Sequence, residues 1–139
     1  MKPLRIALLG IGTVGGGTLE VLTRNAHEIT RRAGRPIEVA VVAARDEAKA
    51  RRVVPSHIPV RSDFHAVVRD PGVDVVVEVM GGHEPAKRLI LEAIAQGKHI
   101  VTANKALLAR DGDEIFAAAR AQDVIVAFEA AVAGGIPII

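Results

Sequence analysis

The chain has 139 residues, half of them hydrophobic and only 2% aromatic, and its 18 basic and 16 acidic side chains leave a net charge of +2. This length suits one domain with one hydrophobic core, and the balanced charge and scarce aromatic residues argue against nucleic-acid binding. The absence of cysteine excludes disulfides, thiolate metal sites and cysteine nucleophiles. No apolar run approaches the length of a membrane span, and the run after Lys2 is too short for a signal peptide, so we expect a cytoplasmic protein.

A strand over residues 4–9 is predicted to end in a glycine-rich turn that opens the first helix. The turn reads Gly10-Ile11-Gly12-Thr13-Val14-Gly15, which is the spacing of a dinucleotide-binding turn. In that motif Gly10 permits the tight turn, Gly12 lets the backbone approach a pyrophosphate, and Gly15 allows the helix to pack on the strand. Glycines also end strands for steric reasons alone, but a position between a strand and a helix favours the dinucleotide interpretation.

Strand-like and helix-like segments alternate through the rest of the chain, which predicts βαβ units and a parallel sheet. The expected helices cover residues 18–33, 46–52, 63–69, 85–96, 104–109 and 111–122, and the expected strands cover 37–44, 74–80, 98–102 and 124–128. Prolines interrupt residues 53–60, so a strand there would lie toward an edge of the sheet. Asp111 and Glu114 have the spacing of a capping box, with Asp111 as the N-cap.

This alternation predicts an α/β fold with a doubly wound, mostly parallel sheet, a Rossmann-type dinucleotide-binding domain over residues 1–139. Five or six strands are consistent with the order 3-2-1-4-5-6. Residues 134–139 are apolar and no polar tail follows them, so we expect a cofactor domain cut from a longer chain. The alternative is a complete domain whose tail packs into its own core.

The end of the second predicted strand is where such a fold contacts the adenosine ribose. An acidic residue there bonds the 2′-hydroxyl of NAD, whereas an arginine accommodates the 2′-phosphate of NADP. The strand ends in Ala44-Arg45-Asp46, with Lys49 one turn further on. Arg45 favours NADP, and Asp46 leaves NAD possible if its carboxylate reaches the ribose. A solvated surface charge is the alternative interpretation of Arg45.

Two further segments follow predicted strands and would lie at the same edge of the sheet. Gly81-Gly82 follow the buried strand that carries Glu78, and they either border a ligand or simply end the strand. His83 could act as a base, although a lone histidine beside a turn is more often an exposed polar residue. Lys105 follows Thr102 and could reach a cofactor or a substrate carbonyl, and the alternative is an inert, solvated lysine.

Together these motifs resemble the N-terminal nucleotide-binding domain of homoserine dehydrogenases. The likeness rests on GIGTVGGG from Gly10, VAARD from Val42, EVMGG from Glu78, VTANKALL from Val101 and FEAAVAGGIP from Phe128. These segments span essentially the whole chain, and the last two are far more specific than the glycine turn. The resemblance implies hydride transfer between L-homoserine and L-aspartate 4-semialdehyde, with NADP or NAD, in threonine and methionine biosynthesis.

The resemblance also implies site residues. Lys105 would be the catalytic lysine near the nicotinamide and the substrate, and Arg45 would contact the 2′-phosphate. The implied cofactor contacts are Gly10, Ile11, Gly12, Thr13, Val14, Gly15, Ala44, Arg45, Gly81, Thr102 and Lys105. A monovalent cation, sodium, would be held by Glu129 and the backbone carbonyls of Val132, Gly134 and Ile136.

In that family a substrate-binding and dimerising domain follows the cofactor domain. The resemblance therefore implies a homo-oligomer for the complete enzyme, and we expect residues 1–139 alone to bind the cofactor with little or no turnover. Three other interpretations stay open: the cofactor domain of another amino-acid oxidoreductase such as an aspartate dehydrogenase, a non-catalytic nucleotide sensor, and a purely structural interaction domain.

Overall fold

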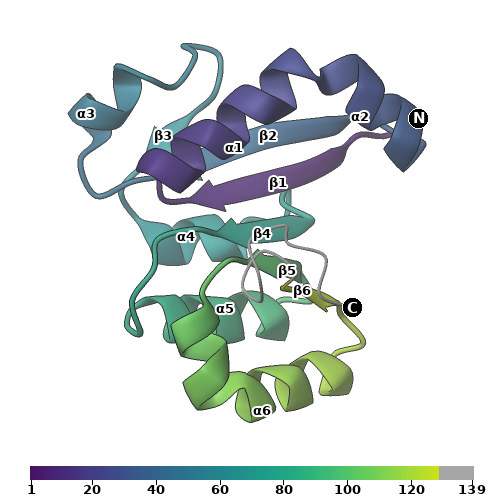
Figure 1. Cartoon of the computed structure of the whole chain (residues 1–139), viewed down its shortest axis with the longest axis vertical. Helices are drawn as coiled ribbons and strands as arrows, with labels where there is room; N and C mark the ends of the chain where they lie inside the picture. Colours follow the sequence, from purple (N-terminus) through teal and green to yellow (C-terminus); the bar gives the residue numbers. More distant parts are fainter. Residues whose placement is uncertain (129–139) are drawn as a thin grey trace.

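The computed structural model describes residues 1–128, which form one parallel sheet with helices on both faces (Figure 1). The strands lie in the order β3-β2-β1-β4-β5-β6. They are β1 (Leu4–Leu9), β2 (Ile37–Ala43), β3 (Val60–Arg61), β4 (Val75–Glu78), β5 (His99–Thr102) and β6 (Val126–Ala127). The helices are α1 (Thr13–Arg24), α2 (Ala26–Ala33), α3 (Glu47–Arg51), α4 (Phe64–Arg69), α5 (Ala86–Ala95) and α6 (Lys105–Ala121). The predicted doubly wound parallel sheet is confirmed.

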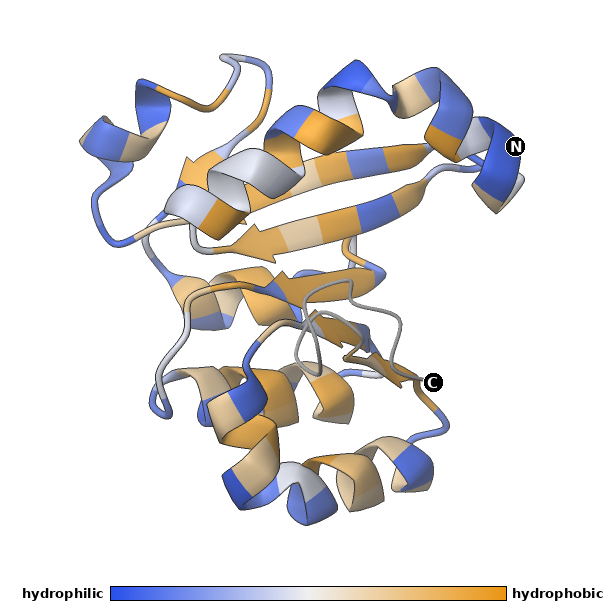
Figure 2. Ribbon diagram, viewed as in Figure 1, coloured by the Kyte–Doolittle hydropathy of each residue, from blue (hydrophilic) through white to orange (hydrophobic). Residues whose placement is uncertain are grey.

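Strand β1 shows why both faces of the sheet carry helices. Its apolar side chains alternate, so Ala7 and Leu9 join a core with α4, α5 and α6, whereas Ile6 and Leu8 join a core with Leu19 of α1. A strand buried on both faces has no solvent-facing side, which explains the continuous apolar runs of the sequence. Figure 2 shows the hydrophobic strands between helices whose outer faces are hydrophilic.

The first helix begins earlier than residue 18, so that prediction is wrong. Helix α1 starts at Thr13, directly after Gly12. It ends at Arg24, and Asn25, with non-helical angles (φ −106°, ψ 21°), separates it from α2. Glycine has a low helix propensity, which placed the expected start after Gly15-Gly16-Gly17. Tertiary packing overrides that propensity, because the close contact of the first turn with β1 requires Gly15 inside the helix.

The predicted division of the helix at Asp111 is present within α6, and only the capping role of Asp111 is wrong. Helical residues lie on both sides of Asp111, whose own backbone angles are non-helical (φ −125°, ψ 16°), so the two predicted segments meet at a kink. Asn104 caps the helix, and its Oδ1 accepts a hydrogen bond from Leu107 N at 3.2 Å. The carboxylate of Asp111 is used elsewhere, because it accepts hydrogen bonds from His83 and Lys87.

The two ends of the sheet are short strands. Strand β3 begins after Pro59 and pairs with β2 alone, which confirms that a strand in this region lies at an edge of the sheet. Strand β6 is confined to Val126–Ala127, shorter than the predicted 124–128. Within residues 1–128, no helix combines the length and apolar character that crossing a bilayer requires. The two central strands, β1 and β4, each have a hydrogen-bonded strand on both sides.

Candidate functional site

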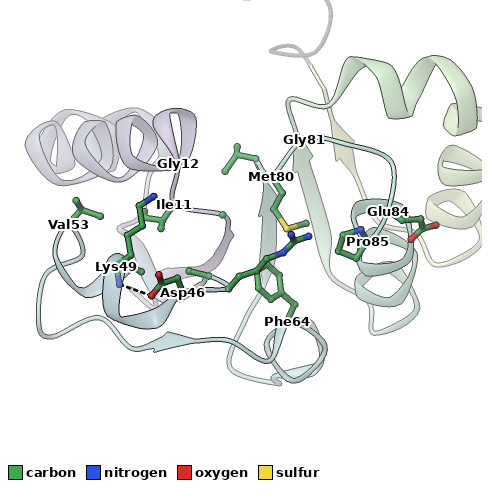
Figure 3. Close-up of a pocket in the computed structure, with 15 residues that line it drawn as sticks. Ile11, Gly12, Asp46, Lys49, Val53, Phe64, Met80, Gly81, Glu84 and Pro85 are labelled. Atoms are coloured by element: carbon green, nitrogen blue, oxygen red, sulfur yellow. Dashed lines mark hydrogen bonds between the residues drawn. The ribbon is translucent and has the colours of Figure 1, made fainter.

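A pocket of about 420 Å³ lies at the carboxyl edge of the sheet, where the strand order reverses between β1 and β4. In open α/β sheets this switch point is where ligands bind. The pocket is formed by the β1–α1 turn, the β2–α3 junction and the segment after β4 (Figure 3). Six of the predicted cofactor contacts line it together: Gly10, Ile11, Gly12, Ala44, Arg45 and Gly81.

Two glycines of the turn are required by the fold itself. Gly10 has φ +101°, and a Cβ on it would lie 3.1 Å from the Cγ of Met80. A Cβ on Gly15 would lie only 2.3 Å from the carbonyl oxygen of Gly10, far inside van der Waals contact. These two positions bring the first turn of α1 against the end of β1, so they explain the close packing of strand and helix.

Gly12 differs, because no contact within residues 1–128 requires it to be glycine. Its φ of −72° is open to any residue, and apart from its neighbours in the chain no atom of the described residues lies within 4 Å of a Cβ built there. Gly12 is the N-cap of α1 and makes no side-chain cap hydrogen bond, and the first turn of the helix carries no acidic residue. The open space thus faces backbone N–H groups without helical partners and the positive end of the helix dipole.

The β2–α3 junction places two cations on the pocket wall. Arg45 and Lys49 both line the pocket and are exposed, and within residues 1–128 neither side chain forms an ion pair or a hydrogen bond. Asp46 Oδ1 accepts a hydrogen bond from Lys49 N at 3.0 Å and so caps α3 (Figure 3). The Asp46 carboxylate is thus engaged as the cap of α3, whereas the two cations on the pocket wall are not engaged by other side chains of the described residues.

Sequence reasoning missed the role of Glu78, which ends β4 with no exposed surface. Its Oε2 accepts hydrogen bonds from Met80 N (2.8 Å) and Gly81 N (3.2 Å), and its Oε1 accepts one from Thr102 Oγ1 (2.9 Å). An acidic residue at the end of the apolar run Val75–Val77 is the signal that could have found it. The carboxylate holds the turn after β4 and ties it to β5.

The predicted residues Thr102 and Lys105 lie outside the pocket lining. The Thr102 side chain is 1% exposed and is occupied by Glu78 and by Asn104 N, so its part is internal in this structure. Lys105 is exposed and is the first residue of α6. The residue before it, Asn104, donates a hydrogen bond from Nδ2 to Gly82 O (2.5 Å), in the turn after β4. A cation at the positive end of a helix opposes the dipole, which favours a functional reason for Lys105.

His83 is held rather than solvated. Its Nε2 lies 2.6 Å from Asp111 Oδ2, and Lys87 Nζ lies 3.1 Å from Asp111 Oδ1 and 2.7 Å from Glu114 Oε2. Burial tends to raise the pKa of Asp111, but the hydrogen bonds from Lys87 and His83 outweigh it, and the pKa lies below its usual value. The hydrogen bonds with Glu114 and Asp111 raise the pKa of Lys87. This cluster fastens the loop after Gly82 to α6.

The expected cation ligands cannot be compared with the structure. Glu129, Val132, Gly134 and Ile136 lie outside the described residues. Within residues 1–128, no three histidine or acidic side chains gather in a way that could hold a metal ion.

The doubly wound sheet and the glycine-lined pocket at its switch point define a dinucleotide-binding α/β domain. Residues 10–129 match the family model described as "Homoserine dehydrogenase, NAD binding domain". Homoserine dehydrogenase of Pseudomonas aeruginosa is 57% identical over 139 residues, and that of Neisseria gonorrhoeae is 58% identical. Each match includes the whole of this chain but only 32% of the length of the curated relative.

Solved structures agree with this assignment. The crystal structure of a homoserine dehydrogenase from Thiobacillus denitrificans superposes with a TM-score of 0.94 at 59% identity, over 99% of this chain and 32% of that one. A homoserine dehydrogenase of S. aureus superposes with a TM-score of 0.86 at 37% identity, over 96% of this chain and 34% of that one. The chain belongs to the homoserine dehydrogenase NAD-binding domain family.

The ion-pair cluster predicts an acid-sensitive attachment of the loop. Because the pKa of Asp111 is lowered in the folded state, its contribution to stability is present above the unfolded pKa of about 3.9 and is lost as pH falls through the folded pKa. We expect Asp111→Asn to lower the melting temperature at pH 7 and to reduce its fall between pH 7 and pH 3. Calorimetry at several pH values measures this, with the exposed Asp113→Asn as control. A pH dependence equal in Asp111→Asn and wild type would contradict the assignment.

Proposed function

We propose that this chain is the cofactor-binding part of an enzyme that interconverts L-homoserine and L-aspartate 4-semialdehyde with NADP, and with NAD as the possible alternative. The observation that carries the proposal is the open space beside Gly12. The packing of the described residues does not require a glycine there, and a diphosphate would fill the space. Helix N–H groups would bind the diphosphate, and Arg45 and Lys49 would meet the charge on the adenosine ribose. The family assignment supports this reaction.

The residues of the chain divide the work along the cofactor. When bound, a nicotinamide supplies or accepts the hydride of the reaction. Gly81 and the turn after β4 would border this end of the cofactor, since Gly81 lines the pocket and follows a different strand from Arg45. Lys105 would hold or move the proton of the substrate hydroxyl, and its place at the start of α6, just after β5, is at the same edge of the sheet. Sodium on Glu129 and the carbonyls of Val132, Gly134 and Ile136 completes the proposal.

Substrate binding needs more groups than this pocket offers. The chain spans 32% of the curated relatives, and the cavity at the switch point is accounted for by the dinucleotide. We therefore expect residues 1–139 to bind the cofactor and to turn over little or no homoserine, and we expect the complete enzyme to be a homo-oligomer. An assay with homoserine and NADP measures this, and turnover comparable to a complete homoserine dehydrogenase would contradict it.

Replacement of Gly12 tests the dinucleotide site directly. Gly12→Val places a side chain in the open space at the start of α1, so NADPH should bind about tenfold more weakly or not at all while the fold persists. Gly17→Val is the matched control, because Gly17 also has open space around it but does not line the pocket. Fluorescence titration of NADPH measures the affinity. Unchanged binding by Gly12→Val would overturn the proposed site.

Replacement of Arg45 tests the choice of cofactor. Arg45→Ala removes a charge-assisted contact to the 2′-phosphate, so NADPH binding should weaken about tenfold or more, whereas NADH binding should change much less. Asp46→Asn provides the comparison, because asparagine keeps the cap of α3, and only a carboxylate bonded to the ribose of NAD would make this change weaken NADH. Titration of both variants with NADPH and NADH gives the result. Equal losses of the two cofactors in Arg45→Ala would remove Arg45 from this role.

A further inference from the structure

We propose that Glu78 is a positioning residue that couples the glycine turn bordering the nicotinamide to Lys105. This inference rests on the proposed function, and it concerns how two segments from different strands are held in one geometry. Glu78 is the last residue of β4, the strand at the switch point. It touches neither substrate nor cofactor in this proposal, because its side chain is wholly buried.

The first half of the coupling fixes the turn after β4. Gly81 and Gly82 both have left-handed backbone angles, with φ of +75° and +76°. The Glu78 carboxylate accepts the N–H groups of Met80 and Gly81, so a single oxygen atom closes the start of the turn. Successive N–H groups directed at one anion form a cradle that gains from the negative charge. The same carboxylate therefore sets where Gly81 stands on the pocket wall.

The second half of the coupling leads to Lys105. The other oxygen of Glu78 accepts a hydrogen bond from the Thr102 hydroxyl, and that hydroxyl accepts a hydrogen bond from Asn104 N at 3.1 Å. Asn104 then caps α6 through Leu107 N and reaches back to Gly82 O through Nδ2. The ring of contacts starts and ends on the glycine turn. Lys105 is the residue directly after Asn104, so its backbone position follows from this ring.

The direction of each hydrogen bond makes a carboxylate the required group. Thr102 donates its one proton to Glu78 and accepts from Asn104 N with one of its two lone pairs. The opposite oxygen must accept from two backbone N–H groups. A glutamine has a single accepting oxygen: if that oxygen faces the backbone N–H groups, the Thr102 hydroxyl loses its acceptor, and if it faces Thr102, the amide nitrogen meets the two backbone N–H donors. A buried carboxylate is costly, and here all its contacts serve the two segments at the pocket edge.

The experiment separates the two ends of the cofactor in the 139-residue chain. NADPH and 2′,5′-ADP, which lacks the nicotinamide, are titrated against wild type, Glu78→Gln, Thr102→Val and the conservative Thr102→Ser. We expect Glu78→Gln and Thr102→Val to weaken NADPH about fivefold to tenfold and 2′,5′-ADP less than about twofold, from loss of hydrogen bonds in one network. Thr102→Ser should behave as wild type.

Amide hydrogen exchange without ligand gives an independent readout. Glu78→Gln should speed exchange at Asn104 N, and Thr102→Val should speed exchange at Gly81 N, because each change releases the far side of the ring. Exchange at the far side equal to wild type in both variants would overturn the coupling. So would equal losses of NADPH and 2′,5′-ADP, or a Thr102→Ser as weak as Thr102→Val. A wild-type chain that bound neither of these ligands, nor NADH, would instead overturn the proposed function, and the inference with it.

Discussion

The site depends on the contact between Gly10 and Gly15. A Cβ on Gly15 would lie only 2.3 Å from the carbonyl oxygen of Gly10. The strand and the helix therefore approach more closely than any residue with a side chain at position 15 would allow. This approach directs the N-terminus of α1 at the sheet edge, where its unpaired N–H groups and dipole favour an anion. The glycine-lined wall of the pocket and the opening at Gly12 follow from where α1 begins.

Around that contact, the parallel sheet gathers residues from distant parts of the chain. The carboxyl ends of β1, β2 and β4 bring Gly12, Arg45 and Gly81 to one pocket, and β5 adds Lys105 beside it. A parallel sheet requires a crossover between each pair of strands, so consecutive loops at one edge are separated by a helix in the sequence. Segments that are 24 to 36 positions apart in the sequence thereby meet at one edge of the sheet.

Polar side chains then specify details that apolar packing leaves open. Asp46 caps α3, Asn104 caps α6, Asp111 fastens the loop of His83, and Glu78 joins β4 to β5. Each is acidic or an amide, and each accepts from donors that would otherwise lack a partner. The two cations on the pocket wall, Arg45 and Lys49, have no such internal role within the described residues. That contrast separates the polar groups that build the site from those available to a ligand.

The sequence by itself determined the class of fold, because alternating apolar runs and glycine breaks specify βαβ units. It also singled out the glycine turn, Arg45 and Lys105, because their chemistry depends on residues that are close together in the sequence. Only the tertiary structure decided the start of α1, the engagement of the Asp111 carboxylate by His83 and Lys87, and the use of Asp46 as a cap. Glu78 belongs with these, since its partners are Thr102 and backbone N–H groups. Such choices depend on which donors lie nearby in space, and neighbours from other strands are invisible along the chain.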